Sequence, residues 1–213
     1  MSAFCRKKSM GTKRDVYKRA DHWTLKAQTE GYPARSVYKL QELDQRFALT
    51  RKAHCVLDLG ASPGSWSAWL LRHLEGSAKV VAVDLNPLDA SVAAMGTGED
   101  LVFIQGDITT NEVRDAVARH GLFDLVVSDA APLTSGNHLV DSSRSRELVH
   151  AALGYAQAVL KVGGSFCAKV FQSGGEQRLL DEMKAMFDGV KVSKPKACRP
   201  TSREIYLVGL DKL

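Results

Sequence analysis

Apolar positions along this chain fall into short runs typical of buried strands, separated by stretches with the period of a helix. The first helical stretch is residues 33–48, where apolar residues recur at steps of three and four and Pro33 suits the first turn. From residue 53 onward an apolar run, a turn and an amphipathic stretch follow one another repeatedly. The strands expected from these runs are residues 53–60, 78–85, 101–107, 122–129, 164–171, 190–195 and 202–210.

Helices are expected between most of these strands, over residues 65–76, 110–119, 142–161 and 176–187. The pair Gly163-Gly164 should stop the third of these helices. Strands that alternate with helices predict a parallel sheet with helices on both faces. The last two strands are joined without a helix, so one of them should run antiparallel. We therefore expect an α/β, Rossmann-like fold with a mostly parallel, seven-stranded sheet, which binds ligands outside the carboxyl ends of its strands.

The distribution of charge divides the 213-residue chain into two parts. Residues 1–26 carry a net charge of +6 and the rest sums to −1, which gives the net +5 of the whole chain. We predict a basic, flexible arm over residues 1–20 and a single domain over 21–213. A basic arm on a near-neutral body is typical of a nucleic-acid binder, although a solvated tail that aids solubility is an open alternative. A second basic cluster favours a polyanionic partner: Lys191, Lys194, Lys196, Arg199 and Arg203.

Several classes of protein are disfavoured by what the sequence lacks. No apolar run approaches the roughly 20 residues that span a bilayer, so we expect no membrane association. The four cysteines are scattered and form no CxxC pair, which is typical of small core residues in a reducing compartment, and we expect a cytoplasmic protein. The six histidines show no ligand spacing, so we expect no metal site.

The loop after the first predicted strand is rich in glycine and reads DLGASPGSW, residues 58–66. Gly60 and Gly64 would let the backbone turn tightly and approach a ligand, and the following helix N-terminus would offer unpaired N–H groups. The spacing is GxxxG and not the GxGxxG of dinucleotide-binding proteins. Alone this motif is weak, because many α/β proteins place a glycine here for geometry.

Four successive predicted strands also end in an aspartate: Asp58, Asp84, Asp107 and Asp129. One such aspartate is commonplace as a turn or cap residue, and for Asp84 capping competes with a contact to ribose hydroxyls. Four along one sheet edge would be an unusual accumulation of like charge unless a ligand rich in donors lies there. S-adenosylmethionine, with its amino groups, ribose hydroxyls and sulfonium, fits that description.

The motifs from about residue 20 to the end resemble those of the FtsJ-like family of ribose 2′-O-methyltransferases. Those motifs are SVYKL, DLGASPGSW, VDLNP, QGD, SDAAP, GGSFCAKVFQ and SREIYLV. Each motif is weak alone, but their order and spacing together are specific. The resemblance implies a Lys-Asp-Lys-Glu catalytic tetrad at Lys39, Asp129, Lys169 and Glu204. It also implies cofactor contacts at Gly64, Trp66, Asp84, Asp107 and Asp129, beside the Asp58 and Gly60 of the same loop.

One position departs from the family pattern. The more usual loop reads APGGW, and Ser65 stands here in place of the second glycine. If that position required a positive φ, the serine would be strained.

Lys169 is unusual because it lies inside an apolar run, SFCAKVF. For an isolated lysine, a side chain that reaches the surface from a strand end is the commoner arrangement. The resemblance favours a different interpretation, in which burial and the nearby Lys39 lower the pKa of Lys169. It would then take the proton of a ribose 2′-hydroxyl or steer its lone pair, while Asp129 and Glu204 hold the two lysines.

The function that these features predict is an S-adenosylmethionine-dependent RNA ribose 2′-O-methyltransferase, active as a monomer. The resemblance favours a uridine of large-subunit ribosomal RNA as the target, with tRNA as an alternative substrate. A ribosome-assembly factor that binds RNA without catalysis is disfavoured by the complete tetrad. A nucleotide-dependent oxidoreductase is disfavoured by the missing GxGxxG. Arg35, Tyr38, Arg199 and Arg203 flank the tetrad in sequence, where RNA contacts and plain surface roles both remain open.

Overall fold

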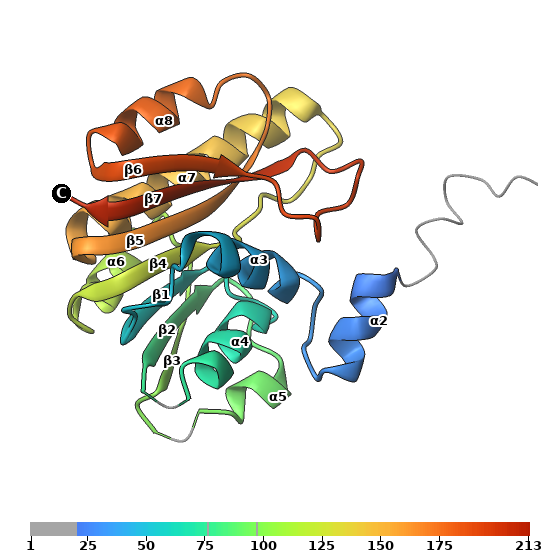
Figure 1. Ribbon diagram of the computed structural model, residues 1–213, viewed down its shortest axis with the longest axis vertical. Coiled ribbons are helices and arrows are strands. Elements are labelled where there is room, and N and C mark those ends of the chain that lie inside the picture. The colour runs from blue at the N-terminus through green and yellow to red at the C-terminus, as the bar shows by residue number, and fades with distance from the viewer. Residues whose placement is uncertain (1–20, 76, 97) are drawn as a thin grey trace, which may run out of the picture.

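A seven-stranded sheet in the order β3-β2-β1-β4-β5-β7-β6 forms the centre of the computed structural model (Figure 1). The structure describes residues 21–213 except 76 and 97, so the predicted basic arm lies outside the described residues. The strands are β1 (Cys55–Leu59), β2 (Lys79–Asp84), β3 (Leu101–Gln105), β4 (Phe123–Ser128), β5 (Leu160–Phe171), β6 (Phe187–Ser193) and β7 (Glu204–Lys212). β7 runs antiparallel to β5 and β6, while β1 to β5 are parallel. The predicted single antiparallel strand is therefore confirmed.

Helices cover both faces of the sheet, as the alternating pattern predicts (Figure 1). One face carries α6 (Asn111–Ala118), α7 (His138–Val159) and α8 (Gln177–Lys184), which pack with side chains such as Leu57 and Phe166 into one core. The other face carries α2 (His22–Thr29), α3 (Val37–Phe47) and α4 (Ser65–His73), which form a second core with Val56 and Val127. Alternate residues of each central strand enter opposite cores because successive side chains point to opposite faces.

Two helical predictions differ from the structure at their starts and ends. The helix expected over 33–48 begins at Val37, so Pro33 lies in the turn before it and not in its first turn. The helix expected over 142–161 is α7, which begins after Asn137, whose side-chain oxygen accepts hydrogen bonds from the backbone N–H groups of the first turn. It ends at Val159, where the chain becomes extended and enters β5 directly. Gly163-Gly164 therefore lies within a strand and does not stop the helix.

Two helices have no counterpart among the predicted elements. In α2, Ala27 is the buried residue, so the apolar periodicity that reveals most helices is absent. Its start is nevertheless capped by Asp21, whose Oδ1 accepts a 3.0 Å hydrogen bond from the backbone N–H of Thr24. The four-residue α5 (Ala90–Ala93) is too short to show a period. No helix in the described part of the chain is long and apolar enough to cross a membrane.

Candidate active site

The carboxyl ends of four adjacent strands bring the four predicted aspartates to one edge of the sheet. β3, β2, β1 and β4 are neighbours in that order and run parallel. Asp107, Asp84, Asp58 and Asp129 follow or end these strands. The strand order reverses between β1 and β4, which is the switch point where open α/β sheets bind ligands. The predicted accumulation of carboxylates along one edge is thus confirmed.

The loop after β1 is fixed at its two glycines, which leave no room for a side chain. Gly60 has φ +73°, and a Cβ there would lie 2.5 Å from the Cα of Ala130. Gly64 has φ +109°, and its Cβ would lie 2.8 Å from a methyl carbon of Val92. Both positions therefore require glycine for conformation and for close approach. The loop of residues 60–64, called the glycine cradle below, therefore packs closely between the residue that follows β4 and helix α5.

Asp84 and Asp107 each accept hydrogen bonds from the turn that follows their strand. This is the turn-capping role, the alternative to cofactor binding. Asp84 accepts hydrogen bonds from the backbone N–H groups of Ser62, at 3.0 Å, and of Asn86, at 2.8 Å. Asp107 Oδ1 accepts from the backbone N–H and the hydroxyl of Thr109, both at 2.8 Å. Asp84 thereby ties the glycine loop to the end of β2. Both carboxylates are held in place beside the cradle.

Asp58 is fully buried, and one of its oxygens has no partner among the residues that the structure describes. Oδ2 accepts a 2.7 Å hydrogen bond from the hydroxyl of Ser67, whereas Oδ1 lacks one. Burial, with the nearby charges of Asp129 and Asp84, raises the pKa of Asp58 to about 7. An unpartnered buried carboxylate oxygen is costly, and a ligand donor would relieve that cost.

Ser65, the departure from the family pattern, is not strained. The described non-glycine residues with positive φ are Ala48, Glu75 and Asp211, so the positive φ values of this loop fall on its glycines, Gly60 and Gly64, and not on Ser65. Ser65 is instead the first residue of α4, and its hydroxyl accepts a 2.7 Å hydrogen bond from the backbone N–H of Ala34. The serine therefore joins α4 to the segment between α2 and α3.

Lys169 is buried, with 7% of its surface exposed, and does not reach the solvent as an isolated strand lysine would. Its Nζ lies 3.1 Å from Oδ1 of Asp129 and donates a 2.5 Å hydrogen bond to the backbone oxygen of the same residue. The hydroxyl of Tyr206 donates to the same Oδ1 at 2.6 Å. Burial alone would raise the pKa of Asp129, but the two lysines, Lys169 and Lys39, outweigh it and hold this pKa below the ordinary value.

Lys39 enters the site from α3 and pairs with Glu204 at the start of β7. Its Nζ lies 2.6 Å from Oε2 of Glu204, and the lysine is only 8% exposed. Burial lowers the pKa of Lys39, but attraction to Asp129 and Glu204 is stronger, so the pKa is raised overall. Lys39 therefore keeps its proton at neutral pH. Two buried lysines therefore meet two half-buried carboxylates here, one carboxylate for each lysine.

Strand pairing explains why Lys169 and Glu204, far apart in sequence, converge. β7 runs antiparallel to β5, so the start of β7 lies beside the end of β5, with Phe171 opposite Glu204. Lys169 lies opposite Tyr206 in the same ladder. Because side chains alternate, Tyr206 shares a face with Glu204. Tyr206 was missed in the sequence, although its position two residues after Glu204 carries that signal.

Trp66 was predicted to contact the cofactor, but its indole ring makes a structural contact to the start of α3. The indole is buried and its Nε1 donates a 2.8 Å hydrogen bond to the backbone oxygen of Ser36. The ring centroid lies 6.0 Å from that of Tyr206. The side chain thus positions α3, which carries Lys39, while a backbone contact to the cofactor stays a prediction.

A mostly parallel sheet with one antiparallel strand, a glycine-rich loop after β1 and an acidic edge make up a Rossmann-like fold of the kind that methyltransferases use. The family model described as "FtsJ-like methyltransferase" matches residues 32–212. The chain therefore belongs to the FtsJ-like methyltransferase family. Methyltransferases of this family take the methyl group from S-adenosylmethionine, and the Asp58 oxygen that has no partner among the described residues fits a donor of such a ligand.

Relatives and solved structures agree with this assignment. A "Ribosomal RNA large subunit methyltransferase E" of Treponema denticola is 48% identical over 198 residues, which are 93% of this chain and 98% of that protein. The protein of the same name from Bdellovibrio bacteriovorus is 42% identical over 200 residues, which are 92% of this chain and 99% of that one. The crystal structure of a ribosomal RNA methyltransferase from Plasmodium falciparum superimposes with a TM-score of 0.71 at 27% identity, covering 85% of this chain and 99% of that one.

Proposed function

We propose that this protein methylates a ribose 2′-hydroxyl of large-subunit ribosomal RNA, with a uridine as the target nucleotide and S-adenosylmethionine as the methyl donor. The observation that carries the proposal is the cluster of two buried lysines, Lys39 and Lys169, paired with the half-buried carboxylates of Glu204 and Asp129, beside the glycine cradle. Relatives at 42–48% identity, named for large-subunit ribosomal RNA, support the choice of substrate.

S-adenosylmethionine supplies, when bound, a methyl group on a sulfonium that is already a good leaving group. The residues that would hold it are Asp58, Gly60, Gly64, Asp84 and Asp107, with Asp129 at the border with the cluster. Asp58 Oδ1 and the carboxylates of Asp84 and Asp107 offer acceptors to the amino groups and ribose hydroxyls of this ligand.

The chain's own task is to activate the ribose oxygen, because a 2′-hydroxyl is almost wholly protonated at neutral pH. Lys169 Nζ, as an ammonium, donates to the ribose oxygen and steers its lone pair toward the methyl group, and it takes the hydroxyl proton itself only after giving its own proton to solvent. Asp129 fixes Nζ, and Tyr206 fixes Asp129. Lys39, which stays charged, stabilises the negative charge that develops on the oxygen, and Glu204 orients it.

All four residues of the cluster come from one chain, so the chemistry does not require a second copy, and we propose that the protein acts as a monomer. A cytoplasmic location, where ribosomal RNA is present, fits this substrate. The predicted basic arm over residues 1–20 would add affinity for RNA, apart from the catalytic domain of residues 21–213.

The test is transfer of labelled methyl from S-adenosylmethionine to undermethylated large ribosomal subunits, to free ribosomal RNA and to bulk tRNA, side by side. Labelled RNA should then resist alkaline cleavage at one position, because a methylated 2′-oxygen cannot attack the adjacent phosphate. Label on a base, or label only in tRNA, would contradict the proposal. RNA binding without any transfer would instead support the non-catalytic assembly factor.

A further inference from the structure

Asp21, the N-cap of α2, uses its two carboxylate oxygens for different partners. Oδ1 accepts hydrogen bonds from the backbone N–H of Thr24, at 3.0 Å, and from the hydroxyl of Thr24, at 3.1 Å. Oδ2 pairs with Nη1 of Arg35 and lies 3.9 Å from Nε of Arg199. One oxygen therefore caps the helix while the other faces two guanidinium groups.

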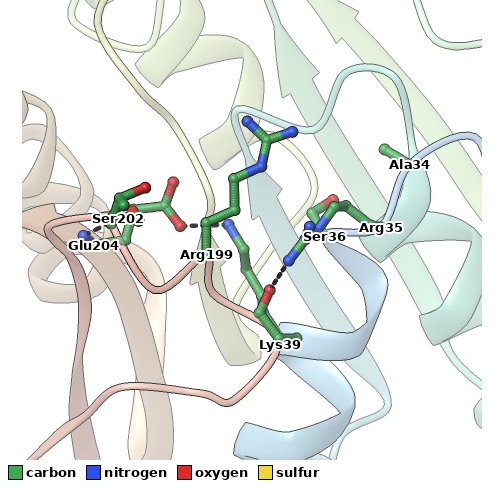
Figure 2. Close-up of a pocket in the computed structure, with 9 residues that line it drawn as sticks. Ala34, Arg35, Ser36, Lys39, Arg199, Ser202 and Glu204 are labelled. Carbon is green, nitrogen blue, oxygen red and sulfur yellow. Dashed lines mark hydrogen bonds and ion pairs between the residues drawn. The ribbon is translucent and has the colours of Figure 1, made fainter. Parts of the chain in front are cut away.

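Both arginines line a cleft of about 360 Å³ that opens directly beside the catalytic cluster (Figure 2). Lys39 and Glu204 line the same cleft. Figure 2 shows Arg35 on one side, Glu204 on the other, and Lys39 reaching between them. Lys39 and Glu204 pair at 2.6 Å, so the further positive charge along the cleft comes from the two arginines, which Asp21 partly offsets. The space suffices for the ribose and phosphate of a nucleotide.

The two arginines differ in how much of their side chains is exposed to solvent. The side chain of Arg35 is 15% exposed, and its Nη2 also donates to the backbone oxygen of Ala197, which fixes the guanidinium plane. Burial, and then the nearby charge of Arg199, lowers the pKa of Arg35. Arg199 is 54% exposed and extends from the β6–β7 connection. Two neighbouring guanidinium groups favour an anion between them.

We propose that Arg35 and Arg199 form a site for a backbone phosphate of the RNA strand beside the target ribose, and that Oδ2 of Asp21 is a resident anion which this phosphate displaces. The inference rests on the proposed function and adds where the strand is held. A carboxylate and a phosphate satisfy the same fork of guanidinium donors. Displacement need not unravel α2, because the cap uses the other oxygen. Asp21 thus keeps the arginines ordered in the free protein and yields to RNA.

The test replaces Asp21 by asparagine, which caps helices as well as aspartate does but carries no charge. Asp21→Asn should bind undermethylated large ribosomal subunits about two- to fivefold more tightly, the range for releasing a partly exposed ion pair. Filter binding measures this without catalysis, and KM for the subunits should fall in parallel while kcat stays unchanged. Arg199→Ala should weaken binding and reduce the slope of log affinity against log salt by about one.

Two exposed residues of α8, Asp181 and Arg178, lie away from the cleft and serve as controls. Their substitutions remove the same charges as the two changes in the cleft. Asp181→Asn and Arg178→Ala should leave binding and KM unchanged.

In the double variant Asp21→Asn/Arg199→Ala, most of the gain from Asp21→Asn should vanish, because one of its two guanidinium partners is gone. Weaker binding by Asp21→Asn would overturn the inference, since Asp21 would then only hold Arg35 in place. Equal tightening by Asp181→Asn would overturn it too. Binding by the wild type without methyl transfer would instead count against the proposed function.

Discussion

Lys169 and Tyr206 lie directly opposite each other on β5 and β7, and both side chains end on the same oxygen, Oδ1 of Asp129. The lysine approaches it at 3.1 Å and the tyrosine hydroxyl donates to it at 2.6 Å. Antiparallel pairing thus gives the carboxylate two donors from adjacent strands. The position of the lysine nitrogen depends on a tyrosine that keeps its hydroxyl proton near neutral pH, since burial and then the Asp129 charge raise its pKa well above the ordinary value.

Removing the Tyr206 hydroxyl should loosen this arrangement. In Tyr206→Phe, Asp129 loses one charge-assisted hydrogen bond, worth roughly 1.5–3 kcal/mol, so kcat should fall about tenfold with a smaller change in cofactor affinity. Steady-state methyl transfer and calorimetric binding of S-adenosylmethionine measure the two effects. The matched control is Tyr155→Phe, because the buried hydroxyl of Tyr155 has no protein partner. If both variants behave alike, the hydrogen bond to Asp129 has no catalytic importance.

Ser65 should prove to be a structural contact and not a defect of the cofactor loop. Ser65→Ala removes the acceptor of the Ala34 N–H and should lower the free energy of unfolding by about 1 kcal/mol. Ser65→Gly, which restores the usual family residue, should lose a further ~0.5–1 kcal/mol through backbone entropy. Urea denaturation measures both. A glycine variant that is more stable, or that binds the cofactor much more tightly, would show that the serine strains the loop.

Asp58 should give the free energy of unfolding a distinctive pH dependence. Its pKa is raised to about 7 in the folded protein, against about 3.9 for an unfolded aspartate. Between those values the native state holds a proton that the unfolded state has lost, so stability falls as pH rises through this window and levels off above it. Asp58→Asn cannot titrate, while its side-chain oxygen can still accept from Ser67.

The measurement is urea denaturation of wild type and Asp58→Asn between pH 4.5 and 7.5. The stability of the wild type relative to the variant should decline across this range by on the order of a few kcal/mol. Asp188→Asn on β6 is the control for removing an exposed carboxylate, and its curve should track the wild type. Parallel curves for Asp58→Asn and wild type would contradict the pKa assigned to this residue.

The sheet was predictable because its central strands are buried on both faces and read as apolar runs between turn residues. The acidic edge followed from it, since parallel strands bring their ends together. Contacts across the fold were not predictable in the same way. Nothing local in PARSVYKL reveals that the backbone N–H of Ala34 donates a hydrogen bond to Ser65. Helix α2 was not predictable either, because Ala27 is its buried residue and no apolar period marks it. The start of α7 was missed because polar cap residues, and not apolar periodicity, determine it.

The catalytic cluster was predictable only through the resemblance. An isolated lysine in an apolar strand is more often a surface residue, and its burial here depends on Asp129 from a different strand. Tyr206 and Asp21 were overlooked for a related reason, because their roles arise from partners distant in sequence: Tyr206 meets Asp129, and Asp21 meets Arg35 and Arg199. Spacing along a chain identifies residues on one face, but which faces meet is decided by the topology.

The most direct test of the account is methyl transfer to undermethylated large ribosomal subunits by Lys169→Ala, with the affinity for S-adenosylmethionine measured on the same protein. The account predicts that transfer falls at least about a hundredfold, the lower range for loss of a positioned proton-handling group, while cofactor affinity changes little. Near-wild-type transfer with unchanged cofactor affinity would contradict the role of Lys169 at the reacting oxygen. Loss of cofactor binding would make it a binding residue instead.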